Sequence, residues 1–340
     1  MNDESLMRRC IQLARLGQGF VAPNPMVGSV IFHDGKIIGE GWHREFGKVH
    51  AEVNALQEIK NKEILSSSIL YVNLEPCSHH GKTPPCADEI IRQGIKKVVI
   101  GMKDPNPEVN GKGIQKLKDA GIEVVVNVLQ KECLQLNKRF ITYHENKRPY
   151  LILKWAQSID GYIGRENERI QISNELSTII THRWRSEESA IMVGTKTIQI
   201  DNPHLSVRNW FGKQPLRISI DKQKSLPRSS HIFDGSQSAL IYTYLESEKN
   251  QLLEYEKLNP NEDVLKQIMQ SLYQRKIQSV LIEGGAVLFR GLIAASLWDE
   301  ARIFYSPILL KSGIKAPEPS YSSFTEELIG DTGYSTSLIK

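Results

Sequence analysis

The strongest constraint on the fold is a set of metal-binding side chains divided between two distant segments. His50 begins a segment with helical character, and Cys77 and Cys86 follow the apolar run from residue 69 to residue 74. One imidazole and two thiolates can supply three ligands to zinc and leave the fourth tetrahedral position for water. The chain is therefore expected to bring the first turn of a helix to the carboxyl end of a strand.

Glu52 stands two residues after His50, close enough to face a metal-bound water without being a ligand. A zinc with an open position lowers the pKa of its water towards neutrality, and a nearby carboxylate can move the proton to a leaving amine. A His-x-Glu element followed by Pro-Cys is typical of zinc deaminases, although eight residues stand here between Cys77 and Cys86 where that pattern has two. The alternative is a closed structural zinc, with His79 or His80 as the fourth ligand.

The amino-terminal half is expected to be a layered α/β domain with partly parallel strands, because strands alternate with helices along it. Asp34-Gly35 between two apolar runs also predicts a hairpin. The expected elements are helices over residues 6–16, 50–59, 86–93, 113–120 and 131–143, and strands over 26–32, 36–42, 69–74, 97–100 and 123–128.

A charged connector that ends in Pro149 predicts a domain boundary, since 340 residues are too many for one ordinary core. One domain is expected over residues 1–145 and another over 150–340. The second has strands over residues 150–155, 190–193, 216–220, 239–243, 279–282 and 300–305, and helices over 175–185, 263–275 and 286–295. The polar stretches 222–235 and 245–261 are expected to be surface loops.

Composition argues against bulk binding to nucleic acid or to a membrane. The net charge is only +4, no long run of like charges occurs, and no segment approaches eighteen consecutive apolar residues. Four cysteines, two of them in the metal motif, make a poor disulfide framework, and the first residues are acidic where a secretory signal would be basic. We therefore expect a cytoplasmic protein with a small-molecule substrate.

Motifs along nearly the whole chain resemble the riboflavin-biosynthesis deaminase that is fused to a reductase. The first half carries Pro-Asn-Pro-Met-Val-Gly from residue 23, His50-Ala51-Glu52, Glu-Pro-Cys-Ser-His-His-Gly-Lys-Thr-Pro-Pro-Cys from residue 75 and Asp-Pro-Asn-Pro from residue 104. The second half carries Leu-Lys-Trp-Ala-Gln-Ser-Ile-Asp-Gly from residue 153 and Asp-Asn-Pro-His-Leu-Ser-Val-Arg from residue 201. The motifs stand in the family's order, and the long element from residue 75 is very specific.

For the first domain, the resemblance implies a cytidine-deaminase-like three-layer fold that deaminates a diaminopyrimidinone carrying a phosphoribosylamino group. It implies one zinc per chain on His50, Cys77 and Cys86, with Glu52 as the catalytic residue. The positions that match the family's substrate contacts are Asn24, His43, His79 and Lys82. Such side chains suit a polar heterocycle and a phosphate. A homo-oligomer, dimer or tetramer, is also expected.

For the second domain, the resemblance implies a fold like dihydrofolate reductase, which binds NADPH and reduces the ribosyl group to ribityl. Glycines after Glu283 would let the backbone approach a pyrophosphate at a helix N-terminus, although a simple tight turn is equally compatible. Matching cofactor positions are Ala156, Gln171, Thr197, Asp201, Gly285, Ala286, Val287, Leu288, Phe289, Arg290 and Gly291. Matching substrate positions are Lys154, Arg169, Arg185, Leu205, Arg208 and Glu283.

Three positions depart from the family pattern in the second domain. Gln171 replaces a tryptophan, Arg169 replaces a serine, and Asn202 stands where aspartate is common. Loss of the ring is expected to remove packing against nicotinamide. The alternatives to a bifunctional enzyme are a deaminase with a non-reducing second domain, a nucleic-acid base deaminase, and a protein that uses zinc only to hold its fold. A nucleic-acid base deaminase would require a basic groove with interleaved aromatic residues. The aromatic content of only 7% argues against this alternative.

Overall fold

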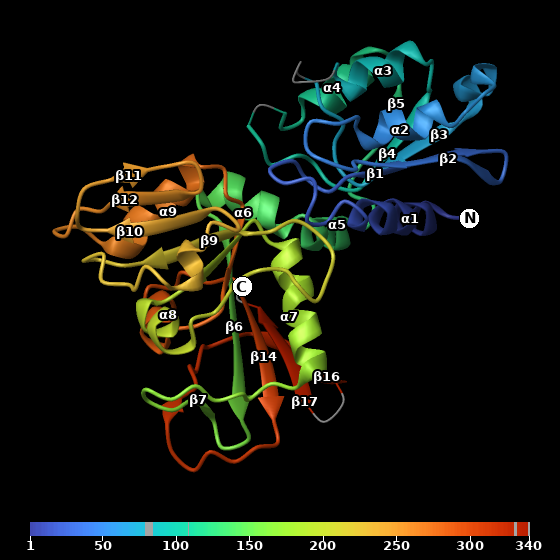
Figure 1. Ribbon diagram of the computed structural model, residues 1–340. Coiled ribbons are helices and arrows are strands. Elements are labelled where there is room, and N and C mark those ends of the chain that lie inside the picture. The colour runs from blue at the N-terminus through green and yellow to red at the C-terminus, as the bar shows by residue number, and fades with distance from the viewer. Residues whose placement is uncertain (79–83, 108, 330–331, 339–340) are drawn as a thin grey trace. The chain divides into compact units, whose positions relative to one another are not determined.

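The computed structural model describes residues 1–78, 84–107, 109–329 and 332–338, which divide into two units, Met1–Lys147 and Arg148–Lys340 (Figure 1). The elements of the first unit are α1 (Asp3–Arg15), β1 (Gly28–His33), β2 (Lys36–Trp42), α2 (Ala51–Gln57), the 3-10 helix η1 (Lys62–Ser67), β3 (Ile69–Val72), α3 (Cys86–Arg92), β4 (Lys97–Ile100), α4 (Lys112–Asp119), β5 (Glu123–Val125), α5 (Gln130–Leu136) and α6 (Lys138–Asn146).

The first unit has three layers around a mixed sheet of order β2-β1-β3-β4-β5. Strand β1 is antiparallel to β2 and β3, whereas β3, β4 and β5 are parallel. Apolar residues of α1 and α5 form the core on one face, and those of α2, α3 and α4 form the core on the other. The carboxyl ends of the parallel strands therefore share one edge of the sheet, where ligands gather in such folds.

Two glycines allow helices to lie directly on the β1–β2 hairpin. A Cβ atom at Gly28 would be 2.1 Å from the carbonyl oxygen of Cys10 in α1, and one at Gly41 would be 2.3 Å from that of Ala51 in α2. Ala51 is the first residue of α2, so the contact at Gly41 sets the position of His50, which caps this helix.

The second unit is built on a ten-stranded sheet of order β11-β12-β10-β9-β8-β13-β6-β14-β17-β16, whose centre is parallel. Its elements are β6 (Tyr150–Ser158), β7 (Tyr162–Gly164), α7 (Glu175–Glu187), β8 (Ala190–Val193), α8 (Thr195–Asp201), β9 (Leu216–Ile220), the 3-10 helix η2 (His231–Phe233), β10 (Ala239–Thr243), β11 (Glu248–Lys249), β12 (Leu253–Lys257), α9 (Val264–Gln274), β13 (Ser279–Ile282), α10 (Ala286–Ala294), β14 (Glu300–Ser306), β15 (Ile314–Lys315), β16 (Ser323–Ile329) and β17 (Thr332–Leu338).

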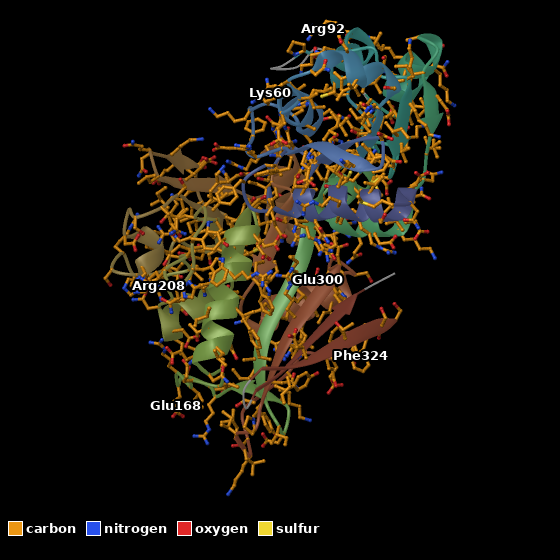
Figure 2. All side chains as sticks on the ribbon, turned by 90° about the vertical axis from the view of Figure 1, so that its right-hand side faces the viewer. Lys60, Arg92, Glu168, Arg208, Glu300 and Phe324 are labelled. Carbon is orange, nitrogen blue, oxygen red and sulfur yellow. The ribbon has the colours of Figure 1, made fainter. Side chains whose placement is uncertain are left out.

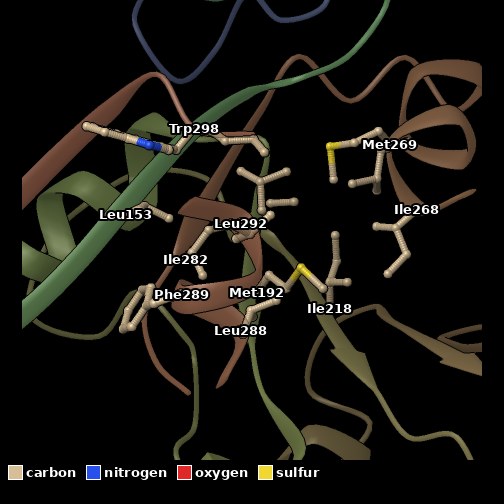
Figure 3. Packing of buried hydrophobic residues seen from close by; sticks show 14 of the residues in the cluster. Leu153, Met192, Ile218, Ile268, Met269, Ile282, Leu288, Phe289, Leu292 and Trp298 are labelled. Carbon is tan, nitrogen blue, oxygen red and sulfur yellow. The ribbon is translucent and has the colours of Figure 1, made fainter. Parts of the chain in front are cut away.

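Helices α9 and α10 cover one face of this sheet and α7 and α8 lie on the other. Figure 3 shows the largest of these cores, in which Leu288 of α10 lies beside Met192 of β8, and Phe289 of α10 and Ile218 of β9 belong to the same cluster. The strands that reach this core end beside the glycines after Glu283, which places that turn at the carboxyl edge of the sheet.

Six predicted strands are confirmed at both ends, namely 36–42, 97–100, 190–193, 216–220, 239–243 and 279–282. The helix expected over residues 131–143 is wrong in one respect, because it breaks at Asn137 into α5 and α6. The stretch 245–261 is not a surface loop throughout, since it contains β12 with the buried Tyr255. Helix α8 and the hairpin β16–β17 were not expected. Among the described residues no helix has the length and apolarity needed to cross a membrane.

Candidate metal centre and second site

The three predicted metal ligands converge from three elements of the first unit. His50 caps α2, Cys77 follows the end of β3, and Cys86 begins α3. Their ligand atoms all lie within 4.8 Å of one another. The Nδ1 atom of His50 is 3.2 Å from the sulfur of Cys86 and 3.6 Å from that of Cys77. One nitrogen and two soft sulfurs at this spacing fit zinc.

The electrostatics of this cluster favour a bound cation. A hydrogen bond from the Cys86 thiol, with help from His50, lowers the pKa of Cys77 to about 4. The backbone N–H of Cys86 also donates to the sulfur of Cys77, over 3.3 Å. The pairing favours at Cys77 the thiolate that metal binding requires, while it raises the pKa of the Cys86 thiol.

Glu52 lies in the first turn of α2 and is buried, with 3% of its surface exposed. Burial raises its pKa, while the neighbouring His50 works in the opposite direction. A carboxyl group with a raised pKa holds a proton more readily than an exposed one, which suits a group that accepts a proton and passes it on. Its place beside the three ligands is the one that the His-x-Glu spacing predicted.

Asn24 and His43 form one wall beside the metal ligands. The side-chain amide of Asn24 donates to Nε2 of His43 over 3.1 Å, and Nδ1 of His43 in turn faces the carbonyl of Val49 at 3.2 Å. This pairing favours the tautomer with the proton on Nδ1. The His43 ring also meets the His50 ring edge-on, with centroids 5.3 Å apart. His79 and Lys82 lie outside the described residues.

Two buried carboxyl groups near the cluster had no role assigned from sequence. Glu75 accepts backbone N–H groups of Asp104, Gly111, Gly113 and Ile114 over 2.9–3.2 Å. Burial, with the nearby charges of Glu75 and Cys77, raises the pKa of Asp104 to about 7. Glu75 directly precedes Pro76 and the metal ligand Cys77, and Asp104 begins the Asp-Pro-Asn-Pro motif. Their places in these motifs were the sequence feature that could have indicated a role.

In the second unit, the structure brings Arg185, Glu283 and Lys154 together. The guanidinium of Arg185 donates two hydrogen bonds to the Glu283 carboxylate over 2.7 and 2.6 Å, and a third to the carbonyl of Ser206. Lys154 of β6 lies close enough for its charge to act on Glu283, and burial lowers the pKa of this lysine. Arg208, labelled in Figure 2, is linked to Arg185 through Ser206, because its guanidinium donates to the hydroxyl of Ser206 and Arg185 donates to the carbonyl of the same residue.

The glycines after Glu283 meet a second strand-to-helix turn. A Cβ atom at Gly285, whose φ is +101°, would be 3.2 Å from the backbone of Gly194, and one at Gly284 would be 3.1 Å from Thr197. The N–H of Gly194 donates to the carbonyl of Gly284. The backbone before α8 therefore contacts the backbone before α10 at Gly194 and Gly285, and a helix N-terminus of this kind suits an anionic ligand.

The remaining predicted cofactor and substrate positions differ in how far their side chains are exposed. Leu205, Leu288 and Phe289 have their side chains in the hydrophobic core. Gln171 is exposed and donates to the carbonyl of Ser173, and the charge of Arg169 acts on the half-buried Asp201. Val287 and Arg290 of α10 are exposed, whereas Ala156, Ala286 and Gly291 are half-buried.

Two family models match the chain. The cytidine and deoxycytidylate deaminase zinc-binding region matches residues 1–102, and the RibD C-terminal domain matches residues 149–317. Among curated relatives, the riboflavin biosynthesis protein RibD of Aquifex aeolicus (strain VF5) is 37% identical over 332 residues, which are 96% of this chain and 93% of that protein.

Solved structures agree over both units. A diaminohydroxyphosphoribosylaminopyrimidine deaminase/5-amino-6-(5-phosphoribosylamino)uracil reductase from Thermotoga maritima is similar with a TM-score of 0.88 and 35% identity, covering 99% of this chain and 98% of that one. RibD from Acinetobacter baumannii is similar with the same TM-score and coverage at 31% identity.

Proposed function

The chain belongs to the RibD family of riboflavin-biosynthesis deaminase/reductases, and on this premise we propose how its own residues carry out the two reactions. Its deaminase domain has the expected cytidine-deaminase-like fold, and its second domain is the RibD reductase domain, which is like dihydrofolate reductase. The proposed first substrate is the diaminopyrimidine phosphoribosylamine named for the Thermotoga relative, and the proposed product is the corresponding uracil.

For deamination, His50, Cys77 and Cys86 would hold one zinc ion. When bound, zinc supplies an activated water at the open position. Glu52 takes a proton from the attacking water on its carboxylate and returns it to the departing amine, which its raised pKa supports. Asn24 and His43 orient the pyrimidine ring, and His79 and Lys82 complete the proposed contacts to the substrate.

For reduction, the turn at Gly285 and the start of α10 would hold the phosphates of NADPH, with Ala156, Gln171, Thr197 and Asp201 along the cofactor. The cofactor supplies the hydride. The charged group of Lys154, Arg169, Arg185, Arg208 and Glu283 would bind the ribose phosphate, with the backbone at Leu205 beside them. The fixed fork of arginine suits a phosphate.

A cytoplasmic location and assembly into a dimer or tetramer are also part of the proposal. All four cysteines are free thiols in the structure, which supports a reducing compartment. We propose that the partners are small molecules and that nucleic acid is not a substrate.

The observation that carries the proposal is the convergence of one imidazole nitrogen and two cysteine sulfurs beside the buried Glu52. The test is metal analysis of the purified protein with assays of amine release and of NADPH oxidation. We expect one zinc per chain, and we expect Glu52→Gln to keep the zinc while deamination falls by roughly a thousandfold or more, since the proton carrier is gone.

Glu132→Gln, which changes an exposed carboxylate of α5, is the control and should leave both reactions unchanged. A metal-free protein that still deaminates, or a Glu52→Gln variant with full activity, would contradict the deaminase proposal. A protein that deaminates but never oxidises NADPH with the deaminated substrate would contradict the reductase proposal alone.

A further inference from the structure

Two buried asparagines hold a short backbone segment of the first unit. Asn137, at the break between α5 and α6, accepts the N–H of Met26 over 2.9 Å and donates to the carbonyl of Met26 over 3.0 Å. Asn73, just after β3, donates to the same carbonyl over 3.0 Å and accepts the N–H of Gly28 over 2.7 Å. The exposed fractions of the two side chains are 2% and 0%. Each amide therefore uses its oxygen and one N–H donor to bind residues 26–28.

This segment carries the wall of the deaminase site. Asn24 stands two residues before Met26, and the N–H of His43 donates to the carbonyl of Val27 over 2.9 Å. The side chains of Asn24 and His43 then bond to each other, and His43 meets the ring of His50. Hydrogen bonds thus join the two asparagines to residues 26–28 and this segment to the backbone of His43, while Asn24 is held by the adjoining chain and by its bond to His43.

The segment has little freedom to move toward α1, because a Cβ atom at Gly28 would already be 2.1 Å from the carbonyl of Cys10. An unsatisfied amide in this core would cost more than the hydrogen bond it loses. The position of residues 26–28 is therefore fixed from one side by packing and from the other by the two amides.

We propose that Asn73 and Asn137 are positioning residues of the deaminase, which set the places of Asn24 and His43 by holding residues 26–28. The inference rests on the proposed deaminase function. It differs from a purely structural role because displacement of the wall changes how the pyrimidine is bound and not only how stable the domain is.

The test compares Asn137→Ala, Asn73→Ala and the double variant with the unmodified full-length protein. We expect each single variant to keep its zinc and to raise the deaminase KM roughly tenfold with a smaller change in kcat, since small displacements of orienting groups are costly. Reduction of separately supplied deaminated substrate should be unchanged. Tyr71→Phe is the matched control, because it removes a partly buried hydrogen bond from a side chain of the same core to Asp3 and leaves the hydrogen bonds to residues 26–28 in place. It should lower Tm but not change KM.

The double variant tests the shared carbonyl. The carbonyl of Met26 keeps one of its two asparagine donors in each single variant and loses both in the double variant. The combined loss in kcat/KM should therefore exceed the product of the single losses by about threefold or more. If an alanine variant does not fold, Asn137→Asp, which keeps the acceptor for the Met26 N–H, replaces it and should show a raised KM.

Variants with a lowered Tm but the KM of the unmodified protein would overturn the inference and leave the proposed function standing. An unmodified protein that binds zinc but does not deaminate would instead overturn the proposed function, and this inference with it. A loss of reductase activity equal to the loss of deamination would also overturn the inference, because it would indicate a general folding defect.

Discussion

At the scale of single residues, the chemistry depends on charged and polar groups that are buried with their partners. The pair of Arg185 and Glu283 is the clearest case, because 11% of the arginine side chain and 6% of the glutamate side chain are exposed. Burial alone would raise the pKa of Glu283, but the charge and hydrogen bonds of Arg185 outweigh it and hold the pKa below its usual value. Removing either partner leaves an uncompensated charge in the second unit.

Glu283→Gln should therefore destabilise the second unit by about 3 kcal/mol and reduce NADPH oxidation, while deamination is retained. Since the folded pKa of Glu283 lies below the unfolded value, its contribution is present above about pH 4 and is lost as pH falls further. Unfolding followed against pH should show less acid destabilisation in the variant than in the unmodified protein. An identical pH dependence in the two proteins would contradict this assignment.

The sequence predicted that His50, Cys77 and Cys86 lie together beside Glu52, because their spacing has a chemical reason, and the structure brings the three ligand atoms within 4.8 Å of one another. The sequence predicted no role for Asn73, Asn137, Glu75 or Asp104. Their roles depend on backbone groups far away in the chain, such as the N–H of Gly113 that Glu75 accepts. No local sequence pattern predicts a contact between residues so far apart in the chain.

At the scale of helices and strands, the site depends on how closely α2 approaches the hairpin. Strands with continuous apolar runs, such as β4 and β8, could be predicted to the residue, because burial on both faces leaves a clear signal. The break at Asn137 could not, since the residues on both sides favour a helix and tertiary hydrogen bonds to Met26 decide the outcome. Strand β12, which lies between β11 and β10 in the sheet, is polar enough to resemble a loop.

Gly41→Ala should push α2 away from β2, because the new Cβ would lie 2.3 Å from the carbonyl of Ala51. His50 caps this helix, so we expect weaker zinc retention during dialysis against a chelator and a deamination rate at least about tenfold lower. Gly121→Ala is the matched control. It introduces a side chain at a φ of +77° with no neighbour within 4 Å. Equal zinc loss in both variants would show that general destabilisation is responsible.

At the scale of the whole chain, each unit has its own sheet and its own hydrophobic cores. The two proposed sites draw their residues from separate units, with the metal ligands in the first and the Arg185 cluster in the second. Family resemblance indicated this division, whereas composition and periodicity indicated only two α/β domains.

Removal of zinc from the intact protein should therefore separate the two reactions. Treatment with a strong chelator is expected to abolish deamination, and zinc added back should restore it. NADPH oxidation with the deaminated substrate should continue at an unchanged rate throughout. Parallel loss of both activities would contradict the separation.

The parallel centre of the second sheet also governs the order in which a growing chain can fold. In the register of the sheet, Tyr150 of β6 is paired with Ser279 of β13, and Ile152 of β6 is paired with Glu300 of β14. Both neighbours of β6 are therefore synthesised long after it. The first unit ends at Lys147 and can fold on the ribosome, whereas the apolar β6 stays unpaired until β13 and β14 have been synthesised. Nascent chains in which β13 has not yet been synthesised would thus expose an aggregation-prone central strand. Chaperones should be needed mainly for the second unit.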